Sequence, residues 1–97
     1  MPQAVIDTNI SLIRKALYNA WNQPPREAAG HSPAEIAFSV GPGGRIQNPR
    51  IQTSSGSATF DQSVLDAAHR VGSISGLSAE FIKQKGLNLV IEFKLSD

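Results

Sequence analysis

Residues 34–53 read AEIAFSVGPGGRIQNPRIQT and combine a strand, a glycine-rich turn and a second strand. Apolar and mostly polar side chains alternate in the first part: Ile36, Phe38 and Val40 on one side, Glu35, Ala37 and Ser39 on the other. Because successive strand side chains point to opposite faces, this pattern predicts one buried and one solvent-facing side. The GPGG segment at 41–44 combines glycines that tolerate positive φ with a proline of fixed φ, which suits a tight reversal. We therefore predict a β-hairpin.

The second strand of this hairpin, RIQNPRIQTSS, does not alternate regularly. Ile46 and Ile51 differ in parity, so a regular strand would point them to opposite faces. A β-bulge near Asn48 and Pro49 would return both to the core. Pro49 also lacks an amide hydrogen, which restricts the strand to a sheet edge or a bulge.

The stretch VIDTNISLIRKALYNAWNQPP carries the strongest helical pattern of the chain. Its apolar residues recur at spacings of three and four: Ile6, Ile10, Ile13, Leu17 and Trp21. This spacing places them on one helical face. Asp7 or Thr8 is a suitable cap for a start near residue 8, although residues 2–4 also allow an earlier start. The Pro-Pro pair prevents continuation, so the helix is expected to end near Trp21 or Asn22.

A second helix follows the SSGS segment. Its apolar stripe consists of Phe60, Val64, Ala67, Ala68 and Val71. Thr59 and Gln62 have the spacing of a capping box, and Gly72 is the expected end. We interpret Phe60 as a core residue and Asp61 as a charge that complements the positive end of this helix.

The remaining stretch predicts a short helix and a last strand. Ser78 is a suitable cap for a helix that carries Phe81 and Ile82 and ends at Gly86. From Leu87 to Leu95 the chain alternates again: Leu87, Leu89, Ile91, Phe93 and Leu95 form the buried side, and Asn88, Val90, Glu92 and Lys94 the other.

The order helix, strand, strand, helix, short helix, strand predicts an α+β, two-layer sandwich. We expect a three-stranded antiparallel sheet of order 2-1-3 with both main helices on one face. The 97 residues suit one domain. The last strand is then an edge strand, and only Ser96 and Asp97 follow it in this chain. Exposed edges invite pairing with other chains, so this edge needs an explanation.

The composition is that of an ordinary globular domain. Hydrophobic residues make up 40%, charged residues 18%, the net charge is +1 and there is no cysteine. The absence of cysteine excludes disulfides and thiolate metal sites. No apolar run is long enough for a membrane span or a signal sequence. The basic residues are scattered: Arg14, Lys15, Arg26, Arg45 and Arg50. We therefore expect no nucleic-acid partner.

Few residues suggest catalysis or metal binding. Asp66 lies three residues before His69, but two ligands are too few to hold a metal. The GSISG segment at 72–76 lacks the spacing of a nucleophile elbow. An enzyme would need His69, Asp66 and Ser75 to converge in a pocket, and His31 lies alone in a predicted loop. We expect no catalytic residue, no metal and no cofactor.

Four ordered pieces resemble the C-terminal periplasmic domain of the TonB/TolA family of energy transducers. They are AWNQPP, FSVGPGGRIQNPRI, SSGSATFD and the terminal LVIEFKL, and the resemblance covers about residues 10–95. Two features depart from the family pattern: VGSISGLS replaces a tract that is usually proline-bearing, and the TonB-type YP start is absent. The tryptophan followed by prolines is more similar to TolA-like members.

The resemblance implies a partner-binding domain without enzymatic activity. Family members are carried on a long linker by an inner-membrane anchor and act with an ion-driven motor complex, so we expect these parts outside residues 1–97. In the TonB branch the last strand pairs with an extended outer-membrane receptor segment, the Ton box; TolA-like members engage envelope-integrity partners of the Tol/Pal type. Sheet edges bind extended peptides through main-chain hydrogen bonds. The predicted partner-binding residues are Asn88, Leu89, Val90, Ile91, Glu92, Phe93 and Lys94.

Two alternatives for this strand remain open. It is an ordinary edge on which Glu92 and Lys94 discourage aggregation, or it pairs with a second copy of the chain to form a homodimer. We interpret Trp21 as a packing residue rather than a binding residue.

Overall fold

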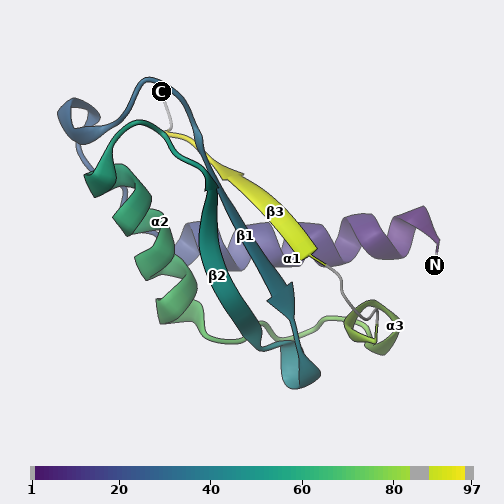
Figure 1. Ribbon diagram of the computed structural model, residues 1–97. Coiled ribbons are helices and arrows are strands. Elements are labelled where there is room, and N and C mark those ends of the chain that lie inside the picture. The colour runs from purple at the N-terminus through teal and green to yellow at the C-terminus, as the bar shows by residue number, and fades with distance from the viewer. Residues whose placement is uncertain (1, 84–87, 96–97) are drawn as a thin grey trace.

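A three-stranded antiparallel sheet forms one layer of the molecule, and two long helices form the other (Figure 1). The computed structural model describes residues 2–83 and 88–95. The elements are α1 (Gln3–Ala20), η1 (Arg26–Ala28), β1 (Ala34–Val40), η2 (Pro42–Gly44), β2 (Ile46–Thr53), α2 (Ala58–Val71), α3 (Ala79–Ile82) and β3 (Asn88–Phe93). The order β2-β1-β3, antiparallel on both sides of β1, confirms the predicted fold.

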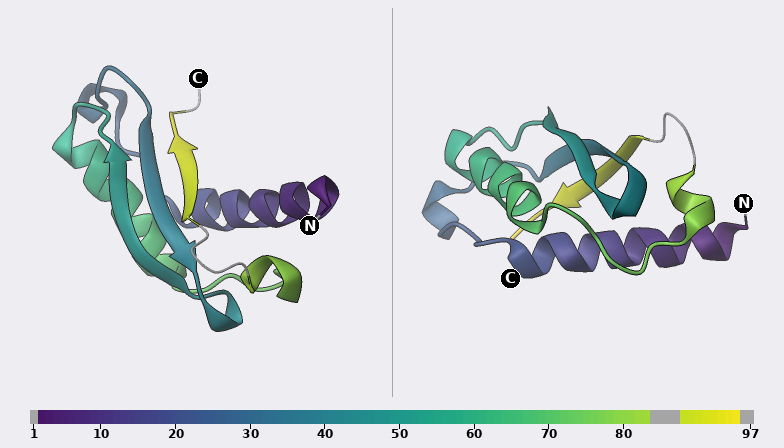
Figure 2. Two further views of the ribbon diagram at one scale, coloured as in Figure 1. Left: turned by 45° about the vertical axis from the view of Figure 1, so that its right-hand side comes forward. Right: turned by 90° about the horizontal axis from the view of Figure 1, so that it is seen from below.

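Helices α1 and α2 pack on the same face of the sheet (Figure 2). The buried apolar side chains of both layers form one core cluster: Ile13, Leu17 and Trp21 from α1 and its end, Ile36, Phe38 and Val40 from β1, Phe60, Val64, Ala67 and Ala68 from α2, and Leu89, Ile91 and Phe93 from β3. These are residues that the periodicity assigns to the buried faces. No helix in the described part of the chain is long and apolar enough to span a membrane.

Helix α1 begins earlier than its polar residues suggest. The helix begins at Gln3, which is the earlier start that Pro2 and Ala4 allow, and neither Asp7 nor Thr8 caps it. Pro2 precedes it with a φ of −63°, which is already suited to the first turn. The Asp7 carboxylate instead accepts a hydrogen bond at 2.9 Å from the side chain of Gln3, one turn earlier. The helix ends at Ala20, next to the predicted end.

The predicted bulge in β2 is confirmed. Ala37 pairs with Arg50 and Ser39 with Gln47, so two residues of β2 lie opposite Phe38 alone. They are Asn48 and Pro49, and Asn48 adopts a positive φ of 53°. The bulge leaves both Ile46 and Ile51 packed against the core, and β2 is an edge strand as Pro49 predicts.

Helix α2 has a different cap from the predicted one. The Ser57 hydroxyl accepts a hydrogen bond from the Phe60 amide at 3.2 Å, so the helix begins at Ala58 and Thr59 is already inside it. The predicted capping box of Thr59 and Gln62 is therefore wrong. Gly72, with a φ of 71°, ends the helix as predicted.

Helix α3 has the predicted cap, because the Ser78 hydroxyl accepts a hydrogen bond from the Phe81 amide. The predictions for Gly86 and Leu87 lie outside the described residues. Leu95 follows β3 and is half-buried against the core.

The turn between β1 and β2 depends on Gly44. Its φ is 78°, and a Cβ atom there would lie 2.1 Å from the carbonyl oxygen of Ile74. The Gly44 carbonyl accepts a hydrogen bond from the Ile74 amide at 2.9 Å. This close approach ties the hairpin turn to the segment that follows α2.

The sheet face away from the helices differs from prediction at one residue. Ala37 does point to this face, but it is only 1% exposed. It lies on the central strand between Arg50 and Val90, whose longer side chains flank it on either side. Its burial is therefore a consequence of its position and small size.

Candidate functional site at the edge of the sheet

The candidate site is the edge of β3 that faces away from β1, called here the outer edge. Strand β3 pairs with β1 along residues 88–93, and no other strand in the described part of the chain lies beside it. The side chains alternate: Leu89, Ile91 and Phe93 are buried, whereas Asn88, Val90 and Glu92 are exposed. The buried set confirms the predicted core face and attaches the strand to the helices.

The hydroxyl of Tyr18 shows which backbone groups of β3 point outward. It donates a hydrogen bond to the Glu92 carbonyl at 2.8 Å and accepts one from the Lys94 amide at 3.3 Å. The N–H and C=O of one strand residue point to the same side, and the side alternates from residue to residue. The outward groups of β3 therefore belong to Asn88, Val90 and Glu92. Those of the buried residues between them face β1.

Val90 lies at the centre of the outer edge. Its amide and carbonyl point away from β1, and the described part of the chain provides no hydrogen-bond partner for either. Its side chain is 42% exposed and is the one large hydrophobic side chain recorded as exposed among the described residues. The edge therefore offers an extended main chain to solvent, which is the geometry required for strand addition.

An aromatic cluster holds Tyr18 in place. Its ring stacks on Phe93 with centroids 4.8 Å apart and planes 7° apart, and it meets Trp21 edge-on at 5.5 Å. Trp21 also contacts Phe60 and Phe93 edge-on. The indole N–H of Trp21 donates to the Ser63 hydroxyl at 2.9 Å, and Trp21 is buried. These contacts confirm the predicted packing role of Trp21.

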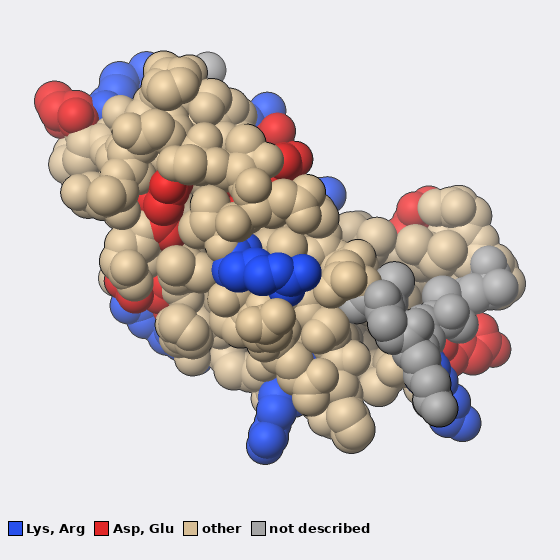
Figure 3. All heavy atoms as spheres, viewed as in Figure 1, with Lys and Arg blue, Asp and Glu red and all other residues tan. Residues whose placement is uncertain are grey.

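Polar residues on the solvent-facing side of the sheet flank the outer edge. Glu35 and Glu92 lie opposite each other at one end, and the Thr53 hydroxyl donates to Glu35 at 2.7 Å. At the other end, Arg50 donates to the Asn88 side chain at 3.4 Å. Figure 3 shows acidic and basic atoms scattered over this face without a large patch of one sign. A partner strand would therefore meet acidic groups at one end and a cation and an amide at the other.

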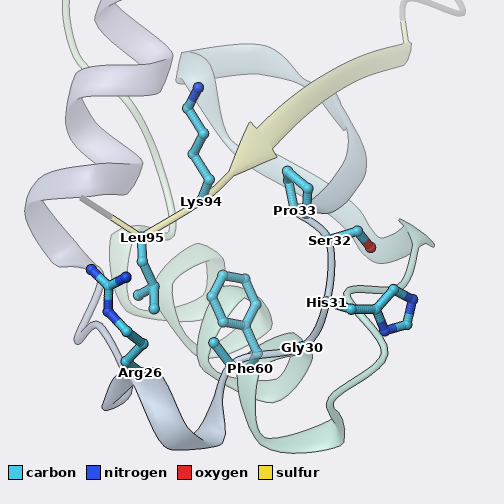
Figure 4. Close-up of a pocket in the computed structure, with 9 residues that line it drawn as sticks. Arg26, Gly30, His31, Ser32, Pro33, Phe60, Lys94 and Leu95 are labelled. Carbon is cyan, nitrogen blue, oxygen red and sulfur yellow. The ribbon is translucent and has the colours of Figure 1, made fainter. Parts of the chain in front are cut away.

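A pocket of about 280 Å³ lies beside the end of β3 (Figure 4). Phe60 and Leu95 point into it, while Lys94 extends away from them. His31 and Pro33 belong to the loop on the opposite wall. The pocket has an apolar floor and no acidic residue in its lining. It adds a hollow with an apolar floor next to the end of the strand.

The SSGSATFD segment is a structural unit rather than a reactive one. The Asp61 carboxylate accepts hydrogen bonds from the Ser54 hydroxyl, the Ser55 amide at 3.0 Å and the Ser55 hydroxyl at 2.8 Å. Burial raises the pKa of the Asp61 carboxyl, but the bonds from Ser54 and Ser55 outweigh it, so the pKa lies below its ordinary value. Asp61 is also in the first turn of α2, where a negative charge is favourable, as predicted. Its role is to hold the loop against the helix.

The residues considered for catalysis do not form a site. Asp66, His69 and Ser75 are all exposed, and Asp66 accepts a hydrogen bond from the side chain of Gln62 at 2.9 Å. His31 is exposed as well. Among the described residues, no group of three or more potential ligands is placed to hold a metal ion.

Sequence reasoning missed two polar residues that the structure makes important. Asn9 is 3% exposed and accepts a hydrogen bond from the Ser78 amide at 2.8 Å, which joins α1 to the start of α3. It lies three residues after Ile6 and four before Ile13, so its place on the buried face was readable. Tyr18 follows the buried Leu17. Tyrosine combines an apolar ring with a polar hydroxyl, so this position was a sign that the ring packs and the hydroxyl finds a hydrogen-bond partner.

Comparison with known proteins agrees with this geometry. The family model described as TonB C terminal matches residues 8–93, which include all three strands and most of α1. A solved structure, "Solution NMR Structure of TolAIII Bound to a Peptide Derived from the N-terminus of TolB", is similar with a TM-score of 0.72 and 29% identity. That match covers 90% of this chain and 72% of the other. A search of curated proteins found no match. Because the family match extends over most of its length, the chain belongs to the TonB C-terminal domain family.

Proposed function

We propose that this chain is the non-enzymatic, partner-binding domain of an energy transducer of the cell envelope. Membership of the TonB C-terminal family supports the proposal. In our proposal residues 1–97 act as one periplasmic domain. An anchor in the inner membrane, a linker and contact with an ion-driven motor complex lie outside these residues. The domain needs no cofactor and no nucleic acid for this task.

The proposed binding site is the outer edge of β3, residues 88–94. The observation that carries the proposal is the outward backbone of Val90, which is free of partners in the described part of the chain. An extended partner segment added here would form a fourth strand and bond to alternate residues of β3. The side chains of the buried residues, Leu89, Ile91 and Phe93, would remain in the core and hold the strand in place.

The same pairing explains how force would pass through the domain. In our proposal the pull enters at the N-terminus of α1, and its component along β3 is parallel to the partner strand. Hydrogen bonds of a ladder are then stretched together rather than broken one after another, because they lie across the strand direction. The strand is anchored by Phe93, which is fully buried, so the load reaches the core.

We propose an outer-membrane receptor segment of the Ton-box type as the partner. The alternative is a TolA-like role with Tol/Pal-type partners in envelope integrity. The similarity to TolAIII favours this alternative, since that domain was solved with a peptide from the N-terminus of TolB. In our proposal both candidates would pair with the same edge.

Titration of the isotopically labelled domain with two sets of peptides tests the proposal. One set comes from receptor N-termini with a Ton box, and the other from the N-termini of TolB-like proteins of the same organism. Amide shifts centred on Val90 support edge pairing, and the set that produces them identifies the branch. Shifts on another surface with a silent β3 would contradict the proposal.

A homodimer through the outer edge is the remaining alternative. Sedimentation over a concentration series separates it from a monomer that waits for a peptide. A dimer that dissociates when peptide is added would place both partners on the same edge.

A further inference from the structure

We propose that Tyr18 limits how far a partner strand can pair along the outer edge. In this inference, which rests on the proposed function, the partner bonds to the outward groups of Asn88 and Val90 and to the amide of Glu92. Backbone pairing stops there, because the next two outward groups are already bonded to Tyr18; Lys94 of the proposed site 88–94 therefore makes no main-chain bond to the partner. Tyr18 is thus a residue that determines partner register and length.

The hydroxyl of Tyr18 occupies the positions that a partner backbone would need. It donates to the Glu92 carbonyl at 2.8 Å and accepts from the Lys94 amide at 3.3 Å. In a parallel ladder, one partner residue makes this pair of bonds, donating to one residue and accepting from the residue two further along. The tyrosine hydroxyl therefore imitates one residue of an added strand. A partner that continues past Glu92 must first displace it.

Displacement is opposed by the packing of the ring. The stack on Phe93 and the edge contact with Trp21 fix the direction of the hydroxyl. Phe93 is 0% exposed and Trp21 6% exposed, so neither moves without opening the core. Helix α1 supplies the tyrosine, so the limit can be removed by a substitution that leaves the sequence of β3 unchanged.

The limit defines the kind of segment that fits. Residues 88–92 allow about five residues of partner, or roughly 16 Å of extended chain. Beyond that length the partner must turn away from the sheet. We therefore infer a protein partner with a short extended segment followed by a turn or a bulky break, rather than a long regular strand.

The bond itself is testable in the free domain by amide hydrogen exchange. We expect the Lys94 amide to be protected and the Val90 amide to exchange freely, although both face outward. Tyr18→Phe keeps the ring and removes the hydroxyl, so it should bring Lys94 to the rate of Val90. Ser39→Ala is the matched control. It removes a hydroxyl that donates to the Gln47 carbonyl of β2, on the side of β1 away from the outer edge. Equal exchange of Lys94 and Val90 in the unaltered domain would overturn the inference.

The effect of Tyr18 on peptide binding is tested with the peptide set that shifts the amide signal of Val90. In the unaltered domain, contacts from the peptide should reach Glu92 and stop before Lys94. In Tyr18→Phe they should extend to Lys94, and affinity should rise by about fivefold to thirtyfold, the effect of one or two ladder bonds of about 1 kcal/mol each. Peptide contacts at Lys94 in the unaltered domain would refute the limit while leaving edge binding intact. A silent Val90 with both sets would refute the proposed function and the limit together, whatever the exchange of Lys94.

Discussion

Replacement of Val90 by proline separates the binding role of the outer edge from its structural role. The Val90 amide points away from β1, so proline removes no hydrogen bond between β3 and β1. Proline is tolerated on edge strands when the missing N–H faces solvent. The side chain of Val90 is 42% exposed and contributes little to the core. We therefore expect the free energy of unfolding to change by no more than about 1 kcal/mol.

The effect on binding should be much larger. Proline removes one donor of the ladder, worth about 1 kcal/mol, and leaves the partner carbonyl facing it without a bond, which costs about 1–2 kcal/mol more. The sum of about 2–3 kcal/mol corresponds to about 30- to 150-fold weaker binding. Isothermal titration calorimetry with the best peptide measures this change, and urea denaturation confirms that the variant is folded.

Val90→Thr is the matched control for this experiment. Threonine keeps the amide and the β-branched shape but changes the exposed side chain. If the backbone carries the affinity, Val90→Thr should bind within about threefold of the unaltered domain. A folded Val90→Pro variant that binds as tightly as Val90→Thr would refute edge pairing at this residue.

Three further changes, one of them with a matched control, test the fold by urea denaturation. Asp61→Asn should lower the free energy of unfolding by about 2 kcal/mol near neutral pH, because the carboxylate accepts three hydrogen bonds. Because the pKa of Asp61 is lowered in the folded domain, its carboxylate adds stability above the pKa that this carboxyl has in the unfolded chain. The difference in free energy of unfolding between Asp61→Asn and the unaltered domain should therefore shrink from about pH 4 downward. Gly44→Ala should cost more than about 2 kcal/mol because of the contact with Ile74, and Gly43→Ala, which has open space at φ 73°, should cost about 1 kcal/mol. Asn9→Ala should cost about 2 kcal/mol, because it leaves the half-buried Ser78 amide at the start of α3 without its acceptor. A loss below 0.5 kcal/mol in any of Asp61→Asn, Gly44→Ala or Asn9→Ala would contradict the role assigned here to that residue.

The sheet could be predicted because its strands face two different environments. Alternation in residues 34–40 and 88–93 reflects one buried and one solvated face, and the odd spacing of Ile46 and Ile51 required the bulge that is observed. These features depend on neighbours close in sequence. The order 2-1-3 followed from the hairpin, from Pro49, which marks one edge strand, and from a helical return that brings the last strand to the other side of the first.

The features that were not predicted depend on contacts distant in sequence or on competition between similar residues. The bond from Tyr18 to Glu92 spans 74 residues, and no local pattern encodes it. At the start of α2, Ser57 and Thr59 are both good caps, and Ser57 is the cap because its hydroxyl also donates to the Ala28 carbonyl. The burial of Ala37 likewise arises from the two strands that flank it.

The irregularity of β2 has a consequence for stoichiometry. Asn48 has a positive φ, Pro49 has no amide hydrogen, and a second register shift falls between Glu35 and Ile36. The outward row of backbone groups on β2 is therefore interrupted, while that on β3 is regular. A sheet with two receptive edges can add copies at both sides and grow into a filament. A sheet with one receptive edge ends its growth after a single addition, so each domain captures one partner and the assembly closes.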